Sequence, residues 1–258
     1  MADVPKPVPP QVIPRPKTWK PGEQAPWAEL PAAELRGISI ERVRSALNAQ
    51  GQAGALPEGI GGDRVLGPTM MVDETSESGL RFINAAVLAL LFEEPEGEAR
   101  LVFTRRSTSL RAHRGEVSFP GGRLDEGEDP PTAAFREAYE EVGLNTAEVT
   151  TVGWIHPVLT MVSGSLIMPI VAAAASRLHL VANPAEVERV FDVALRDLAD
   201  PDIFHEERWS IEGRTIPGSP DNSFAVWFFE VEGEMIWGAT ARMIHELLSI
   251  TLLGLSEK

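Results

Sequence analysis

The sequence contains no cysteine. This absence excludes disulfide bonds, thiolate metal sites and a cysteine nucleophile, and it agrees with a reducing cytoplasm. Long apolar runs are also lacking, since the longest, residues 166–175, contains Pro169 and is far too short to span a bilayer. The first residues lack the charged and then apolar pattern of a secretory signal. We therefore expect a soluble, cytoplasmic protein with no membrane partner.

Positive charge is scarce as well: 23 lysines and arginines face 38 acidic residues, a net charge of −15. This balance argues against broad binding to nucleic acid, and it would repel a polyanionic small molecule unless cations or a local basic patch intervene. The basic residues do gather in one segment, as Arg105, Arg106, Arg111, His113, Arg114 and Arg123. Such clusters are commonly solvated loops, but beside a metal site this one would form an anion clamp.

The N-terminal part differs from the rest in composition. Residues 1–35 hold nine of the 21 prolines and show almost no hydrophobic periodicity. We expect a proline-rich tail in an extended conformation, ordered only if it docks, with Trp19 and Trp27 as candidates for docking. A helix at residues 39–49 and a loop then lead across residues 36–80 into the main domain.

The remaining chain, residues 81–255, alternates between apolar strands and amphipathic helices. Strands are expected at residues 81–92, 99–106, 116–119, 149–158 (with an end at His156-Pro157), 166–174, 186–193, 208–216 and 225–231, and helices at 130–143 and 239–253. The first two strands should form a hairpin, and the first should be buried on both faces. Asp129 is a good N-cap for the first helix and Gly143 a good C-terminal stop. This mixture predicts one α/β domain.

The helix expected at residues 130–143 carries an unusual acidic face. Glu137, Glu140 and Glu141 are spaced i, i+3 and i+4, so their side chains lie on one side of the helix. Unpaired, they would repel one another and destabilise the helix. A divalent cation that prefers oxygen ligands would relieve this repulsion, and Mg²⁺ or Mn²⁺ fits best.

Residues 122–144 match the Nudix box, GX5EX7REUXEEXGU. Five residues separate Gly122 from Glu128, and seven more precede residues 136–144 (REAYEEVGL). Every fixed position is filled, and Ala138 is a small but acceptable aliphatic residue at the first U position. The chain therefore resembles the Nudix hydrolases. The resemblance implies a Nudix fold, an α/β/α sandwich with a mixed β-sheet and a loop-helix-loop catalytic motif.

The resemblance also implies roles within the box. The three glutamates would be catalytic and hold Mg²⁺ or Mn²⁺, with the Gly122 carbonyl as a further ligand. Glu128 and Arg136 would form an ion pair that aligns the helix, which is a structural task. The metal would bridge a pyrophosphate and activate a water. The implied reaction is hydrolysis of a nucleoside diphosphate linked to another group, whereas a simple acidic surface helix would not account for Glu128 and Arg136.

The segment before the box narrows the substrate. Residues 104–107 (TRRS), Arg111, Gly115 and residues 119–122 (FPGG) are similar to the motif LLTXRSX3RX3GX3FPGGXXD of the coenzyme A pyrophosphatases, although Val and Phe replace its leucine pair. This Nudix subfamily cleaves CoA to 3′,5′-ADP and 4′-phosphopantetheine. The resemblance implies four substrate-binding arginines, namely Arg105, Arg106, Arg111 and Arg123. Guanidinium groups suit phosphate oxygens, but each arginine could instead be a structural partner of the many acids.

Downstream of the box, residues 183–193 are also similar to this subfamily. A further acid is often needed there as a base or metal ligand, and Glu186 and Glu188 are the candidates. Both could instead be ordinary surface acids. His113 and His156 are more typical of loop or hydrogen-bonding residues than of ligands in an oxygen-rich site.

Three functions remain open at this point. The first is metal-dependent hydrolysis of CoA or acyl-CoA, and the second is Nudix hydrolysis of another nucleoside diphosphate derivative such as ADP-ribose or NADH. The third is a catalytically silent Nudix domain that senses a nucleotide, although degraded glutamates would be expected there and all are present. The sequence leaves open the preferred CoA derivative, the general base, the number of metal ions and the oligomeric state, a homodimer included.

Overall fold

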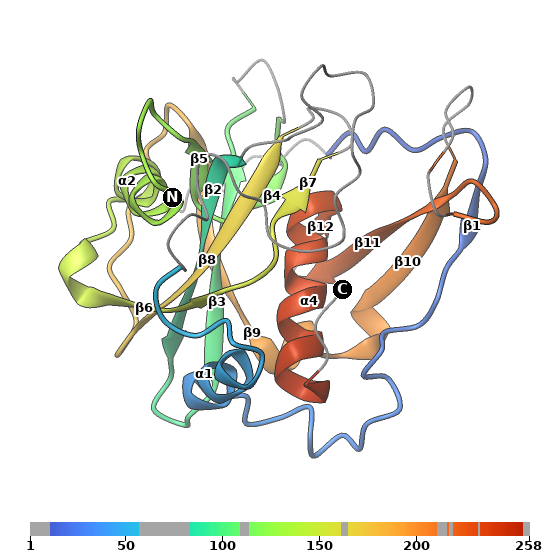
Figure 1. Cartoon of the computed structure of the whole chain (residues 1–258), viewed down its shortest axis with the longest axis horizontal. Helices are drawn as coiled ribbons and strands as arrows, with labels where there is room; N and C mark the ends of the chain where they lie inside the picture. The colour runs from blue at the N-terminus through green and yellow to red at the C-terminus, as the bar shows by residue number, and fades with distance from the viewer. Residues whose placement is uncertain are drawn as a thin grey trace, which may run out of the picture.

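The computed structural model describes residues 11–56, 83–108, 114–160, 165–210, 216, 219–231 and 233–254. Within these ranges the chain forms two β-sheets and four α-helices (Figure 1). The helices are α1 (Ile40–Ala49), α2 (Pro130–Val142), α3 (Leu195–Leu198) and α4 (Gly238–Leu253). Short 3₁₀ turns occur at Thr146–Glu148 and Pro201–Ile203.

The larger sheet has eight strands and is mixed, with the order β4-β3-β2-β8-β6 and with β5, β7 and β9 paired to β2, β8 and β3. Its strands are β2 (Ile83–Glu93), β3 (Ala99–Arg106), β4 (Val117–Ser118), β5 (Gly121–Arg123), β6 (Val149–Trp154), β7 (Val158–Leu159), β8 (Leu166–Ala174) and β9 (Val187–Ala194). The expected hairpin of β2 and β3 is confirmed, and β2 runs parallel to β8.

The strand expected at residues 149–158 ends near His156-Pro157 as expected, but its range is wrong, because β6 ends at Trp154 and Val158 belongs to a second strand, β7. The break falls at His156 and Pro157. The backbone N–H of His156 donates to a carboxylate oxygen of Glu246 instead of a neighbouring strand (3.1 Å), and Pro157 has no N–H to donate.

The second sheet is antiparallel, with the order β1-β10-β11-β12. Its strands are β1 (Trp19–Pro21), β10 (Phe204–Trp209), β11 (Phe224–Val231) and β12 (Glu234–Trp237). The strand expected at residues 208–216 therefore had the wrong bounds, because β10 begins at Phe204 and ends at Trp209. Residues 211–215 lie outside the described residues.

Two hydrophobic cores lie on opposite faces of the mixed sheet, because successive side chains of a strand alternate between faces. Leu88 and Leu90 of β2 pack in the cluster that holds the buried alanines of α2. Ala89 and Leu91 pack in the other cluster, with α1, α4 and part of the second sheet. Figure 1 shows α2 on one side of the mixed sheet and α4 between the two sheets. The expected α/β fold with a mixed sheet and helices is confirmed, with the second sheet as an addition.

The described part of the expected N-terminal tail lies against the folded body. Residues 19–21 form β1, paired in register with β10. Trp27 is fully buried and its indole N–H donates to the carbonyl of Ala199 (2.9 Å), whereas Trp19 is 45% exposed. Residues 1–10 lie outside the described residues, as do residues 57–82 of the loop expected before the domain.

Candidate active site

Helix α2 begins and ends where the local sequence rules predict. Asp129 is the N-cap, and its carboxylate accepts a hydrogen bond from the N–H of Thr132 (2.9 Å). Gly143 ends the helix in the left-handed conformation with φ 65°, which favours glycine. One face of the helix packs on the sheet through small buried side chains such as Ala134 and Ala138. The charged residues lie on the other faces of the helix.

Arg136 ties this helix to the loop that precedes it. Its guanidinium donates to both carboxylate oxygens of Glu128, each at 2.9 Å, and to the carbonyl of Arg123 at 2.9 Å. Glu128 also accepts from the N–H of Asp125 (2.9 Å). The hydrogen bonds between the two side chains raise the pKa of Arg136 and lower the pKa of Glu128. The geometry is that of a bidentate pair, which restricts both orientation and distance.

The three glutamates of α2 have different surroundings. Arg136 donates to Glu137 at 3.0 Å and to Glu140 at 3.3 Å, and the Glu140 side chain is about half exposed (49%). Glu141 is buried at 2% exposure and accepts from the Gly121 N–H (3.1 Å) and from Arg106 (3.3 Å). Burial raises the pKa of Glu137 and raises the pKa of Glu141 to about 7.

The two glycines before the helix bring the backbone against these carboxylates. A Cβ atom on Gly122 would lie 2.4 Å from the carboxyl group of Glu137, and one on Gly121 would lie 2.4 Å from the carbonyl oxygen of Ala86. Gly121 has backbone atoms in the way of any side chain and a φ of 156°, whereas a side chain at Gly122 would displace the Glu137 carboxyl group. The register pairs Gly122 with Ala86, so β5 fastens this loop to the central strand β2.

These residues suit a hard divalent cation in the type of donor they offer. All available donors are carboxylate or carbonyl oxygens, and the backbone of Gly122 borders the Glu137 carboxyl group. Glu141 is a buried carboxyl with raised pKa, so an added cation would favour its ionised form. Across the described ranges, however, no three acidic or histidine side chains are already grouped around one point. Arg136 holds Glu137 and Glu140 in this arrangement.

The structure separates the four arginines that the sequence grouped together. Arg106 reaches the site through Glu141. Arg123 is exposed beside it, and Arg111 lies outside the described residues, as does His113. Arg105 is buried and pairs with Glu234 of β12 on the other side of the sheet. For Arg105, the salt-bridge alternative matches the geometry and the phosphate-binding expectation does not.

The downstream acids separate in the same way. Glu186 lies close enough to Glu137 and Glu141 that its charge contributes to raising the pKa of both. Glu188 instead lies 3.6 Å from Arg105, within the ion pairs at β12. His156 is hydrogen-bonded to Glu246 of α4, and its Nδ1 atom lies 2.6 Å from the carboxylate. Only the first of these three borders the glutamates of α2.

The sequence did not reveal two long-range partners: Glu234, which pairs with Arg105, and Asn183, which contacts helix α2. Glu234 pairs with a residue 129 positions away, and no local pattern marks such a contact. Asn183 precedes Pro184, and an asparagine before a proline is a recognisable turn signal. Its contacts with α2 are described below.

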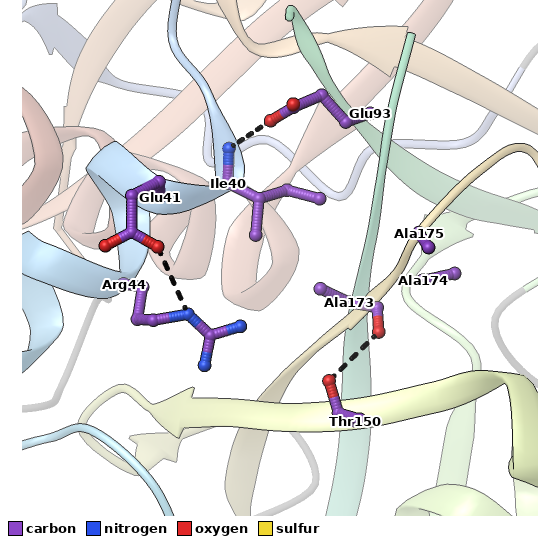
Figure 2. A pocket seen from close by; sticks show the side chains of 8 residues that line it. All are labelled: Ile40, Glu41, Arg44, Glu93, Thr150, Ala173, Ala174 and Ala175. Atoms are coloured by element: carbon purple, nitrogen blue, oxygen red, sulfur yellow. Dashed lines mark hydrogen bonds and ion pairs between the residues drawn. The ribbon is translucent and has the colours of Figure 1, made fainter.

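A pocket of about 340 Å³ lies at a different place (Figure 2). It is lined by Ile40, Glu41, Arg44, Glu93, Thr150 and Ala173 to Ala175. Glu93 is at one end of β2, and Ala86, which pairs with Gly122, is near the other end. Seven residue-to-residue steps along the strand separate Ala86 from Glu93 by about 23 Å. The pocket is therefore distinct from the glutamate site.

Comparison with known proteins identifies the family. The NUDIX domain family model matches residues 83–211. The Uncharacterized Nudix hydrolase NudL of Photorhabdus laumondii is 36% identical over 165 residues, which cover 64% of this chain and 82% of that protein. Nudix hydrolase 15, mitochondrial, of Arabidopsis thaliana is 35% identical over 176 residues, covering 65% of this chain and 58% of the relative. The chain belongs to the NUDIX domain family.

The match defines the chemistry at a general level. The chain is a Nudix hydrolase of the pyrophosphatase type, acting on nucleoside diphosphate derivatives, and such enzymes generally use divalent metal ions.

The crystal structure of the Nudix hydrolase RenU of M. smegmatis is 31% identical, with a TM-score of 0.39, covering 49% of this chain and 81% of that one. In the described part of the chain, no helix is long and apolar enough to cross a membrane.

Proposed function

We propose that this Nudix hydrolase cleaves the pyrophosphate bond of coenzyme A or an acyl-CoA, giving 3′,5′-ADP and (acyl-)4′-phosphopantetheine. One observation carries the proposal. The N–H of Arg106 donates to the carbonyl of Glu116 (2.9 Å), and the N–H of Gly115 donates back to the carbonyl of Arg106 (3.1 Å). The basic segment between them, which includes Arg111 and Arg114, therefore starts and ends beside Arg106, the residue that contacts Glu141.

This placement supports a site for an additional phosphate. CoA carries a 3′-phosphate that ADP-ribose and NADH lack, and guanidinium groups bind phosphate through paired, charge-assisted hydrogen bonds. With a net charge of −15, the protein needs local positive charge to attract such an anion. We assign Arg106, Arg111 and Arg123 to the substrate, and we leave Arg105 to the ion pair with Glu234.

Glu137, Glu140 and Glu141, with the Gly122 carbonyl, would hold the divalent cation, Mg²⁺ or Mn²⁺. When bound, the ion supplies charge neutralisation for the pyrophosphate and lowers the pKa of a water. The chain itself orients these groups, because Arg136 and Glu128 fix α2 relative to the loop.

Glu186 is the residue that we propose to accept the proton of the attacking water. Its charge interacts with those of Glu137 and Glu141, and its side chain is only half-buried, so water can reach it. Glu188 is less suited because it lies near Arg105 on the other side of the sheet. The cytoplasmic location stays a prediction.

The test is product analysis with purified protein, CoA and Mg²⁺ or Mn²⁺. We expect 3′,5′-ADP and 4′-phosphopantetheine, and a kcat/KM on CoA about tenfold or more above that on dephospho-CoA, which corresponds to ~1.4 kcal/mol. Equal kcat/KM values on CoA and dephospho-CoA would contradict the proposal that the basic segment binds the 3′-phosphate. Faster cleavage of ADP-ribose or NADH would favour the broader Nudix activity, and binding without cleavage of any of them would favour a nucleotide sensor.

A further inference from the structure

The segment between β8 and β9 runs past the C-terminal end of α2. The last carbonyls of a helix have no partner within the helix. Here the N–H of Val181 donates to the carbonyl of Val142 (2.9 Å), and the N–H of Asn183 donates to the carbonyl of Glu141 (2.8 Å). The side-chain amide of Asn183 donates to the carbonyl of Glu140 (3.3 Å). Asn183 thus contacts the backbone of two of the three glutamates.

Asn183 also shapes the turn that carries Glu186. Its side-chain oxygen accepts from the N–H of Ala185 (3.2 Å), which is an Asx-turn. Its carbonyl accepts from the N–H of Glu186 (3.0 Å) and the N–H of Val187 (2.8 Å). The carbonyl of Glu186 in turn accepts from the N–H of Ser107 (2.7 Å). The backbone on both sides of Glu186 is therefore held in place.

We propose that Asn183 is a positioning residue that sets Glu186 against Glu137 and Glu141 by tying the turn to helix α2. The inference rests on the proposed function, in which Glu186 accepts a proton. Because Glu186 is half-buried, the hydrogen bonds of its backbone, more than packing of its side chain, determine where the carboxylate lies. Small displacements of a reacting group lower rates strongly, by ~100-fold for about 1 Å.

A purely structural role for Asn183 would give a different result, and Asn145 provides the matched control. Asn145 follows the same helix, and its side-chain oxygen accepts from the N–H of Ala147 (3.2 Å) in the same kind of turn. Its amide donates to Glu148 (2.6 Å) and its carbonyl accepts from the Glu148 N–H (3.1 Å), so in the described part of the chain the hydrogen bonds of Asn145 stay within its own turn. Replacement of either asparagine by alanine removes an Asx-turn, but only one of the two turns carries Glu186.

The experiment compares Asn183→Ala, Asn183→Asp, Asn145→Ala, Glu186→Gln and the double variant Asn183→Ala with Glu186→Gln. We expect Asn183→Ala to lower kcat roughly 10- to 100-fold with KM within about threefold, and Asn145→Ala to stay within about twofold. Asn183→Asp keeps the oxygen that accepts from Ala185 and loses the amide that donates to Glu140, so its kcat should lie between those of the wild type and Asn183→Ala. The double variant should be no slower than Glu186→Gln alone, because both changes act through one group.

Amide hydrogen exchange provides a readout that does not depend on turnover. Exchange in residues 183–187 should be faster in Asn183→Ala and unchanged in Asn145→Ala. The inference is overturned if Asn183→Ala matches Asn145→Ala in kcat, if the losses add in the double variant, or if exchange in this turn is unchanged. If the wild-type protein fails on CoA, the substrate assignment fails separately, and the same ratios are measured on whichever Nudix substrate it cleaves. If no substrate is cleaved, Glu186 has no proton to accept and the inference is overturned together with the proposed function.

Discussion

Arg105 and Arg106 are neighbours at the end of β3, but their side chains serve two different regions. Adjacent residues of a strand point to opposite faces. Arg106 contacts Glu141 on the α2 face. Arg105 lies on the other face, paired with Glu234 of β12, where it joins the mixed sheet to the second sheet.

The two regions differ in how their charges are balanced. Glu234 and Arg105 are both buried, with side chains 7% and 6% exposed, and Arg189 and Glu188 lie within 3.6 Å of one or the other. Among the described residues in these ion pairs, two arginines, Arg105 and Arg189, face two glutamates, Glu188 and Glu234. Around Glu141 two guanidinium groups, those of Arg106 and Arg136, face the carboxylates of Glu137, Glu140, Glu141 and Glu186, and the charges of Glu137 and Glu186 raise the pKa of Glu141 further.

The difference separates a structural ion pair from a functional site. Burial of charge without full compensation costs stability, so it persists mainly where function requires it. The region around Arg105 satisfies its own charges and should act in folding. The region around Glu141 has an excess of negative charge that a cation would compensate.

The largest effect should come from the glutamates of α2. We expect Glu140→Gln and Glu141→Gln each to lower kcat by on the order of 10³-fold or more, because loss of metal-ion stabilisation removes several kcal/mol. Initial rates with CoA measure the loss, and circular dichroism checks that the fold is intact. Full activity in either variant would contradict the metal assignment. Arg105→Ala should leave kcat of the folded fraction near the wild-type value.

The reverse comparison concerns stability. Arg105→Ala should lower the free energy of unfolding by about 3–5 kcal/mol, because it leaves the buried Glu234 carboxylate without its main partner. Urea denaturation at pH 7.5 measures the change. The control is Arg196→Ala, which removes an exposed pair with Asp197 and should change stability by less than about 1 kcal/mol. A loss as small as that of the control would show that the pair does not join the two sheets.

The pH dependence of the metal-free protein provides a third test. The pKa of Glu141 is about 7 in the folded chain and near 4.5 when unfolded. The folded state therefore binds more protons between these values, and stability should fall as pH rises from 4.5 to 7, by up to ~3 kcal/mol. Glu137 changes in the same direction. Glu128 has a lowered pKa, so the stability that it contributes is lost only as pH falls below about 4.5.

Glu141→Gln isolates this contribution. Denaturation in EDTA between pH 4.5 and 8 should show a flatter profile in Glu141→Gln than in the wild type, because glutamine does not titrate. Arg105→Ala should keep the wild-type slope, since Glu141 is unchanged there. Parallel profiles for wild type and Glu141→Gln would mean that burial does not raise the pKa of this carboxyl.

The smallest effect should come from the basic segment. Arg111→Ala should raise KM for CoA about tenfold, because a charge-assisted bond to phosphate at a solvent-accessible site contributes about 1.5 kcal/mol, the lower end of the usual range. KM for dephospho-CoA and the melting temperature should change little. An unchanged KM for CoA would make Arg111 a structural residue.

Much of the α2 region followed from local rules. The N-cap at Asp129, the stop at Gly143 and the spacing of the glutamates depend on neighbours within a few residues, and the structure reproduces the helix. The bidentate contact of Arg136 with Glu128 also spans only eight residues. An end at His156-Pro157 was expected, but the second strand that starts at Val158 was not, because no local pattern shows that the His156 N–H turns to Glu246 of α4.

The sequence by itself determined the acidic helix, its caps and the family to which the chain belongs, since these depend on spacing along the chain. Only the tertiary structure decided which arginine faces the site, which downstream acid borders it, and where residues 19–21 lie. Those outcomes depend on strand register and on contacts such as that between Arg105 and Glu234, 129 residues apart. Contacts over such distances follow from chain topology and burial, which no local pattern of residue types specifies.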